Sequence, residues 1–117
     1  MDANDLVASV RHSGEVAIVD LVGQLDGTAE KTLASAWDAT GDAPVVALNF
    51  SESTYINSTG IALIVGLLGR ARSAGRTVRA FGLMDHYREI FDITRLSDFM
   101  EIHGDEAGAV DGLTANA

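Results

Sequence analysis

The sequence contains no cysteine, which excludes disulfide bonds and thiolate metal sites and leaves the cellular compartment open. Basic residues are also few: 8 Lys and Arg stand against 17 Asp and Glu, and the formal net charge is −9. Nucleic acids and anionic membranes are bound through basic surfaces, so this composition argues against both kinds of partner. It is compatible with a basic protein partner, although an acidic surface can serve solubility alone.

Long apolar segments are missing as well. The longest apolar run, residues 61–68, is far too short to span a bilayer. Residues 1–5 are acidic and polar, whereas a signal peptide begins basic and continues with an apolar stretch. With 117 residues, of which 47% are hydrophobic, the chain has the size and apolar content of one globular domain. We therefore predict a single soluble, cytoplasmic domain over residues 1–117, without membrane insertion.

Signatures of enzymes and of cofactor sites are absent from the sequence. It has no G-x-S-x-G elbow, no P-loop and no G-x-G-x-x-G fingerprint. The three histidines, His12, His86 and His103, are far apart, and no pair has the spacing of metal ligands. We predict a binding protein rather than an enzyme, with no metal and no cofactor.

Apolar strand patterns alternate with helical patterns along most of the chain. Two strand-like segments around the turn at residues 12–14 predict an N-terminal hairpin, and Gly41 and Pro44 end the first helix. Single helices between the later strands imply right-handed crossovers and a largely parallel sheet. The predicted fold class is therefore α/β, in the order β β α β α β α β α. Strands are predicted at residues 6–10, 15–22, 45–50, 76–83 and 99–102, and helices at 28–40, 57–74, 85–96 and 105–113.

The helix predicted at residues 57–74 carries two stripes. One is apolar, and the other consists of small residues, with two glycines that each cost about 1 kcal/mol of helix propensity. Close packing inside the domain is the favoured explanation of the small stripe, and close approach of a partner is the alternative. The stripes comprise Ile61, Ile64, Val65 and Leu68, and Ala62, Gly66, Gly69 and Ser73.

A hydroxyl-rich turn, residues 54–60, is predicted between the third strand and this helix. A helix N-terminus directs backbone N–H groups and the positive end of its dipole toward one point, which suits an anion or a phosphorylated hydroxyl. A plain helix cap explains the same residues, because Asn57, Ser58 and Thr59 are all good N-cap types. A hydrolase that uses Ser58 is disfavoured, since no base or oxyanion motif accompanies the serine.

Four segments, in this order, resemble the STAS domain family, the sulfate-transporter and anti-sigma-antagonist family, in its single-domain anti-anti-sigma form. The resemblance covers residues 5–113 approximately and is carried by four sequences on matching elements. These are Gly23-Gln24-Leu25-Asp26, Val46-Ala47-Leu48-Asn49-Phe50, Asn57-Ser58-Thr59-Gly60-Ile61 and Ile90-Phe91-Asp92-Ile93-Thr94-Arg95-Leu96.

The resemblance implies a mixed, largely parallel sheet with an N-terminal β-hairpin and about four helices. It also implies a partner switch, in which the domain binds an anti-sigma factor, a GHKL-type serine kinase, and so frees a sigma factor. Phosphorylation of Ser58 would switch binding off. A non-switching STAS subunit, in a stress-sensing assembly or beside a lipid-transport ATPase, is the alternative. The implied docking face comprises Gly23, Gln24, Leu25, Asp26, Asn57, Ser58, Thr59 and Gly60.

Two residues depart from the family pattern. Asn57 stands where the family usually has Asp, which keeps the cap but removes a negative charge beside Ser58. Arg95 stands where the family often has Gly, which implies a turn that does not need a positive φ.

Overall fold

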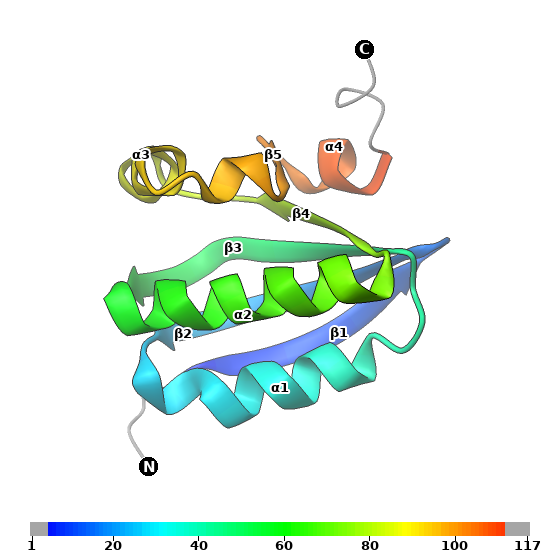
Figure 1. Cartoon of the computed structure of the whole chain (residues 1–117), viewed down its shortest axis with the longest axis horizontal. Helices are drawn as coiled ribbons and strands as arrows, with labels where there is room; N and C mark the ends of the chain where they lie inside the picture. Colours follow the sequence, from blue (N-terminus) through cyan, green and yellow to red (C-terminus); the bar gives the residue numbers. More distant parts are fainter. Residues whose placement is uncertain (1–4, 112–117) are drawn as a thin grey trace.

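The alternating strands and helices fold into one five-stranded sheet with helices on both faces (Figure 1). The structure is a computed structural model that describes residues 5–111. Apart from two short 3-10 turns, η1 and η2, the elements follow the predicted order. They are β1 Val7–Ser13, β2 Val16–Leu25, η1 Gly27–Ala29, α1 Glu30–Ala39, β3 Val45–Ile56, α2 Ser58–Ala74, β4 Thr77–Phe81, α3 Asp85–Ile93, η2 Leu96–Asp98, β5 Glu101–His103 and α4 Glu106–Asp111.

The sheet has the strand order β1-β2-β3-β4-β5. The predicted hairpin is confirmed, because β1 pairs with β2 in antiparallel fashion, while β2, β3, β4 and β5 pair in parallel. β3 is the central strand, and consecutive residues Val46, Ala47 and Leu48 are all buried, as expected for a strand covered on both faces.

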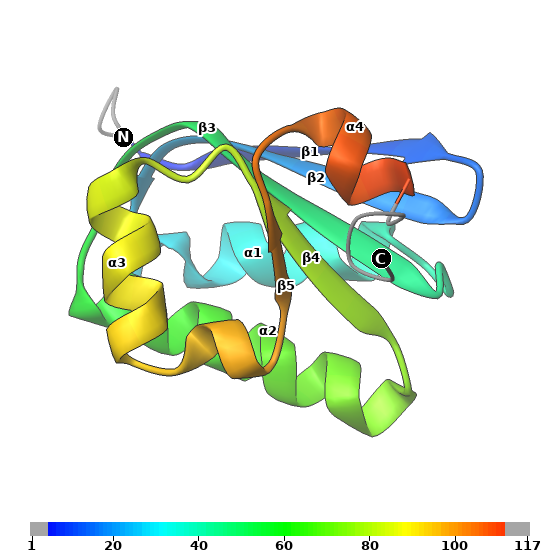
Figure 2. The ribbon, with the colours of Figure 1, turned by 90° about the horizontal axis from the view of Figure 1, so that it is seen from above.

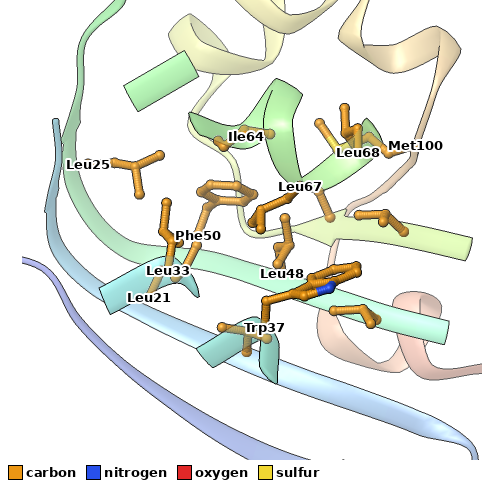
Figure 3. Packing of buried hydrophobic residues seen from close by; sticks show 14 of the residues in the cluster. Leu21, Leu25, Leu33, Trp37, Leu48, Phe50, Ile64, Leu67, Leu68 and Met100 are labelled. Atoms are coloured by element: carbon orange, nitrogen blue, oxygen red, sulfur yellow. The ribbon is translucent and has the colours of Figure 1, made fainter. Parts of the chain in front are cut away.

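Two apolar clusters hold the layers together. The larger cluster joins α1 and α2 to one face of the sheet, with Leu33 and Trp37 from α1 and Ile64 from α2 packed on Leu48 and Phe50 of β3 (Figure 3). The smaller cluster lies beneath α4, which Figure 2 shows on the opposite side of the sheet from α1 and α2.

The ends of β2 and β3 are longer than predicted. Residues 23–25 and 51–56, predicted to lie beyond the strand ends, continue their strands, because Gln24 pairs with Tyr55 and Leu25 with Ile56. Register shifts interrupt this ladder on either side of Gly23, whose φ of 108° favours glycine. The prediction of a turn over residues 54–56 is therefore wrong, because long-range pairing of the two backbones outweighs the local turn preference of these residues.

Other boundaries differ by a few residues. β1 extends to Ser13, β4 and β5 are shorter or shifted, and η2 replaces the predicted end of the third helix. Residues 112–113, the predicted end of the last helix, lie outside the described residues.

The face of α2 that meets the core also differs from the prediction. Val65 is 50% exposed, and the buried stripe consists of positions 60, 64, 67, 68 and 71. The small-residue stripe faces outward, and a Cβ added at Gly66 or Gly69 would meet nothing within 4 Å. The predicted close packing of this stripe inside the domain is therefore wrong.

The turn after α3 corrects a second prediction. Arg95 has φ 66° and lies in the left-handed region, so this turn does require a positive φ. Ile93 and Thr94, at the end of the predicted helical segment, are both exposed. The helix ends at Ile93, and the chain reverses at Arg95 to bury Leu96.

One close approach fixes the start of α2 against β2. A Cβ added at Gly60 would collide with the backbone carbonyl of Leu25, so the helix passes the end of β2 where only glycine fits. The backbone N–H of Asn57 donates to the Leu25 carbonyl oxygen at 3.3 Å in the same place.

A polar network ties β1, β2, β3 and α4 together on the other face. Arg11 binds Asp20 through two hydrogen bonds of 2.6 and 2.9 Å and also reaches Glu106 at 2.7 Å, while Asn49 donates to Asp20 at 2.8 Å. The hydrogen bonds from Arg11, followed by the one from Asn49, outweigh desolvation and lower the pKa of Asp20. Arg11 likewise lowers the pKa of Glu106.

Gly60→Ala should destabilise the protein by about 2–3 kcal/mol, because the added methyl group meets a backbone that cannot move aside. Gly66→Ala is the matched control in the same helix, and it should stabilise by about 0.5–1 kcal/mol, since its methyl group enters open space. Urea unfolding of both variants measures the two differences. If Gly60→Ala lowers the unfolding free energy by no more than Gly66→Ala changes it, the close approach is contradicted.

Asp20→Asn should lower the unfolding free energy at pH 7 by up to about 1 kcal/mol, a modest value because Arg11 is half exposed. The pKa of Asp20 is depressed in the folded state, so its contribution is complete above the ordinary pKa of 3.8 and disappears as the pH falls below that value. Chemical denaturation of both proteins from pH 7 to pH 2 checks this. A difference that persists unchanged at the acid end would show that the carboxylate charge is not responsible.

Candidate functional site

The structure brings the two predicted segments together at one edge of the sheet. Residues 23–26 end β2, residues 57–60 begin α2 directly after β3, and the two strands are parallel neighbours. Their carboxyl ends therefore meet at the same edge, which also receives the N-terminal ends of α1, α2 and α3 (Figure 1). Open α/β sheets commonly bind their ligands outside this edge.

The eight predicted residues divide into accessible and supporting positions. Ser58 and Thr59 are exposed, while Gly23, Gln24, Asp26 and Asn57 are half-buried. Leu25 is fully buried in the core, and Gly60 is buried against it. Leu25 and Gly60 can therefore set the shape of the surface, but their side chains do not form part of it.

Asn57 is the N-cap of α2, as the sequence indicated. Its backbone is extended (φ −103°, ψ −178°), and its Oδ1 accepts a hydrogen bond of 2.9 Å from the N–H of Gly60. Its carbonyl oxygen accepts the first bond of the helix from the N–H of Ile61 at 2.9 Å. Because one side chain satisfies the cap, neither Ser58 nor Thr59 is needed for it.

Ser58 is the first residue of α2, and its side chain is exposed. Within residues 5–111 its hydroxyl has no hydrogen-bond partner. The hydroxyl stands at the positive end of the dipole of a 17-residue helix. It is available to a reagent that approaches from solvent.

Asp26 shapes the neighbouring turn. Its Oδ1 accepts hydrogen bonds from the N–H and the Oγ1 of Thr28 at 2.9 and 2.6 Å, which caps η1. The hydrogen bonds from the side chain and the backbone of Thr28 lower the pKa of Asp26, so this carboxylate is ionised at neutral pH. η1 lies against the first turn of α2, with Thr59 beside Gly27.

Two apolar residues at this edge were not singled out from the sequence. Tyr55, near the end of β3, is 47% exposed, and Met84, between β4 and α3, is 58% exposed. Tyr87 fixes the start of α3 here, because its hydroxyl accepts a hydrogen bond of 3.1 Å from the N–H of Ile56. The alternation of exposed Tyr55 and buried Ile56 becomes informative only when residues 51–56 are recognised as a strand.

Metal groups and membrane spans are the other features to consider in the described chain. Among residues 5–111, no three His, Asp or Glu side chains form a group that could hold a metal ion. In the same range, none of the helices combines the length and the apolar character needed to cross a membrane.

Comparison with known proteins agrees with this architecture. The family model for the STAS domain matches residues 8–109. The anti-sigma-B factor antagonist of Listeria monocytogenes is 35% identical over 71 residues, and the match spans 61% of this chain and 61% of that protein. The matched segment is thus about three fifths of the relative's own length.

Solved structures share the fold at low sequence identity. An anti-sigma factor antagonist from Mycobacterium paratuberculosis superposes with a TM-score of 0.76 at 18% identity, covering 95% of this chain and 96% of the other. The anti-sigma factor antagonist SpoIIAA in its unphosphorylated form gives a TM-score of 0.70 at 13% identity, covering 95% and 100%. The phosphorylated form of Bacillus SpoIIAA also gives a TM-score of 0.70, at 18% identity, and the match covers 92% of this chain and 99% of the other. With the family match over residues 8–109 and the predicted mixed, largely parallel sheet both in place, the chain belongs to the STAS domain family.

Proposed function

We propose that this chain is an anti-sigma factor antagonist whose partner is an anti-sigma factor of the GHKL-type serine kinase class. One observation carries the proposal: an exposed serine, Ser58, opens α2 on a face that the end of β2 completes. In this mechanism the unmodified face binds the anti-sigma factor and so releases a sigma factor for transcription. Membership of the STAS family and similarity to the Listeria anti-sigma-B factor antagonist support it.

Phosphorylation of Ser58 is the proposed off switch. The kinase transfers the γ-phosphoryl group of ATP to Ser58 Oγ, with release of ADP and a proton. The cap supports this role, because Asn57 bonds to Gly60 and leaves the Ser58 hydroxyl free within residues 5–111. The solved structures of SpoIIAA in unphosphorylated and phosphorylated forms provide a precedent on this fold.

Charge explains the direction of the switch. A phosphoserine adds ~2 negative charges, and the exposed helix N-terminus stabilises them by only about 0.3–1 kcal/mol. The face carries the ionised Asp26 and has no Lys or Arg in residues 22–27 or 55–60. Desolvating additional unpaired charges against a partner costs several kcal/mol, so phosphorylation weakens binding without disturbing the fold.

Ser58→Asp should weaken binding of the anti-sigma factor at least tenfold, about 1.4 kcal/mol or more, because it places a charge in the docking face. Ser58→Ala should keep the affinity of the parent and abolish phosphorylation. Thr59→Ala is the matched control, since Thr59 is the adjacent exposed hydroxyl, and it should still be phosphorylated. Titration calorimetry and mass spectrometry measure the two properties. Phosphorylation of the Ser58→Ala protein at the parental rate would refute the site.

Asn57→Asp should make phosphorylation more disturbing to the fold. The new carboxylate would keep the cap but repel the phosphate on the next residue, by about 1–3 kcal/mol per charge pair at ~6 Å before salt screening. The phosphorylated form of this variant should therefore melt lower relative to its unmodified form than in the parent, by about 4 °C for each kcal/mol. Equal melting differences in both proteins would count against the electrostatic account. A large rise in phosphorylation rate would instead show that Asp orients the hydroxyl for the kinase.

Affinity capture from the native cell tests the function itself, with the unmodified chain as bait and Ser58→Asp as the matched control. We expect an anti-sigma factor with a GHKL ATPase domain on the first bait and its loss on the second. Recovery of a stress-sensing assembly or a lipid-transport ATPase on both baits alike, with no phosphate on Ser58, would favour the non-switching accessory role.

A further inference from the structure

The outer edge of β1 is long and regular, and no other strand of residues 5–111 covers it. β1 is the terminal strand of the sheet, and its seven residues pair with β2 in unbroken register from Val7↔Val22 to Ser13↔Val16. Proteins usually blunt such edges with proline, lysine, bulges or short strands, because the outward N–H and C=O groups can pair with another chain. Residues 7–13 contain no proline and no lysine, and their one charged side chain, Arg11, is bound to Asp20 and Glu106.

A groove of about 570 Å³ runs between this edge and α1. Its floor is formed by β1 residues between Ala8 and His12, and its wall by α1 residues between Lys31 and Ala39. The wall is built mainly of small side chains, among them Ser35. No lining residue is acidic, although the chain as a whole carries a net charge of −9.

We propose that a second copy of this chain occupies the groove, with β1 pairing antiparallel to its symmetry mate to form one continuous sheet. A two-fold axis perpendicular to the sheet relates the copies, as in other isologous dimers. With the axis beside Val10, Ala8 lies opposite the second copy's His12. All seven residues of one β1 then pair with the seven residues of the other. The side chains of each β1 that lie on the α1 face of the sheet then fill the groove of the other copy.

The position of α1 makes this arrangement self-complementary. Val10 is the midpoint of β1, and Ser35 of α1 lines the same groove, so we place the two-fold axis beside Val10 and near Ser35. The two α1 helices then run antiparallel on the same face of the sheet, and small side chains allow them to approach closely. Lys31, near one end of α1, then meets the exposed Asp38, near the opposite end of the second copy's α1.

This surface is separate from the candidate docking face. None of the eight residues predicted for partner binding lines the groove, so both copies of the dimer would present Ser58. The mutual repulsion of two chains of net charge −9 makes the dimer weak and dependent on concentration.

Sedimentation of the whole chain from about 1 µM to about 1 mM, the range of weak association, tests the pairing. The weight-average mass should rise from 12.3 kDa toward twice that value. Ser35→Arg places like charges on the axis and should keep the mass at 12.3 kDa. Ser73→Arg, the same change at an exposed serine of α2, should leave dimerisation intact. A parent that stays monomeric at the highest concentration, or equal losses in both variants, would overturn the proposal.

A cysteine cross-link tests the register, since the chain has no cysteine of its own. Facing residues on antiparallel strands have Cα atoms about 4.5–5.5 Å apart, within disulfide range. Val10→Cys should therefore form a disulfide-linked dimer under oxidation far faster than Val65→Cys, an exposed valine on α2. Equal cross-linking rates would indicate random collision and contradict the paired strands. Far-ultraviolet circular dichroism of each variant confirms that the comparison is made between folded proteins.

Discussion

The first turn of α2 rests directly on the backbone of Leu25, and this contact determines the geometry of the candidate site. It requires glycine at position 60, because any side chain there would collide with the Leu25 carbonyl. The hydrogen bond from Asn57 N–H to the same carbonyl, at 3.3 Å, joins the strand ladder to the helix start. As a result, two segments more than thirty residues apart in sequence form one continuous surface, in which the buried Leu25 and Gly60 hold the exposed Ser58 in place.

Division of roles among adjacent residues makes a reversible modification compatible with a stable fold. Asn57 satisfies the helix N-terminus, Gly60 provides the close contact, and Ser58 is exposed and makes no hydrogen bond within the described residues. A group added to Ser58 therefore changes the surface charge without removing an interaction on which the fold depends. The same separation extends to the whole domain, because the Arg11–Asp20–Glu106 network and the free edge of β1 both lie away from this surface.

Features determined by neighbouring residues could be predicted from the sequence. The N-cap at Asn57 and the alternation of strands and helices both depend on local chemistry, and the structure has them. Features determined by residues that are distant in the sequence could not be predicted in this way. The extension of β3 through residues 51–56 depends on pairing with β2, and the rotation of α2 that exposes Gly66 depends on which side chains the core accepts. Arg95 was misjudged because an arginine gives no local indication of its left-handed conformation, φ 66°.

The most direct test of this account is to locate the partner on the surface by amide NMR. Spectra of the labelled chain would be recorded with and without the anti-sigma factor purified from the native cell. We expect the largest changes to fall on residues 23–28 and 55–60, and to disappear when Ser58 is phosphorylated. Changes centred on the β1 edge or on β5 and η2, or changes that persist after phosphorylation, would contradict it.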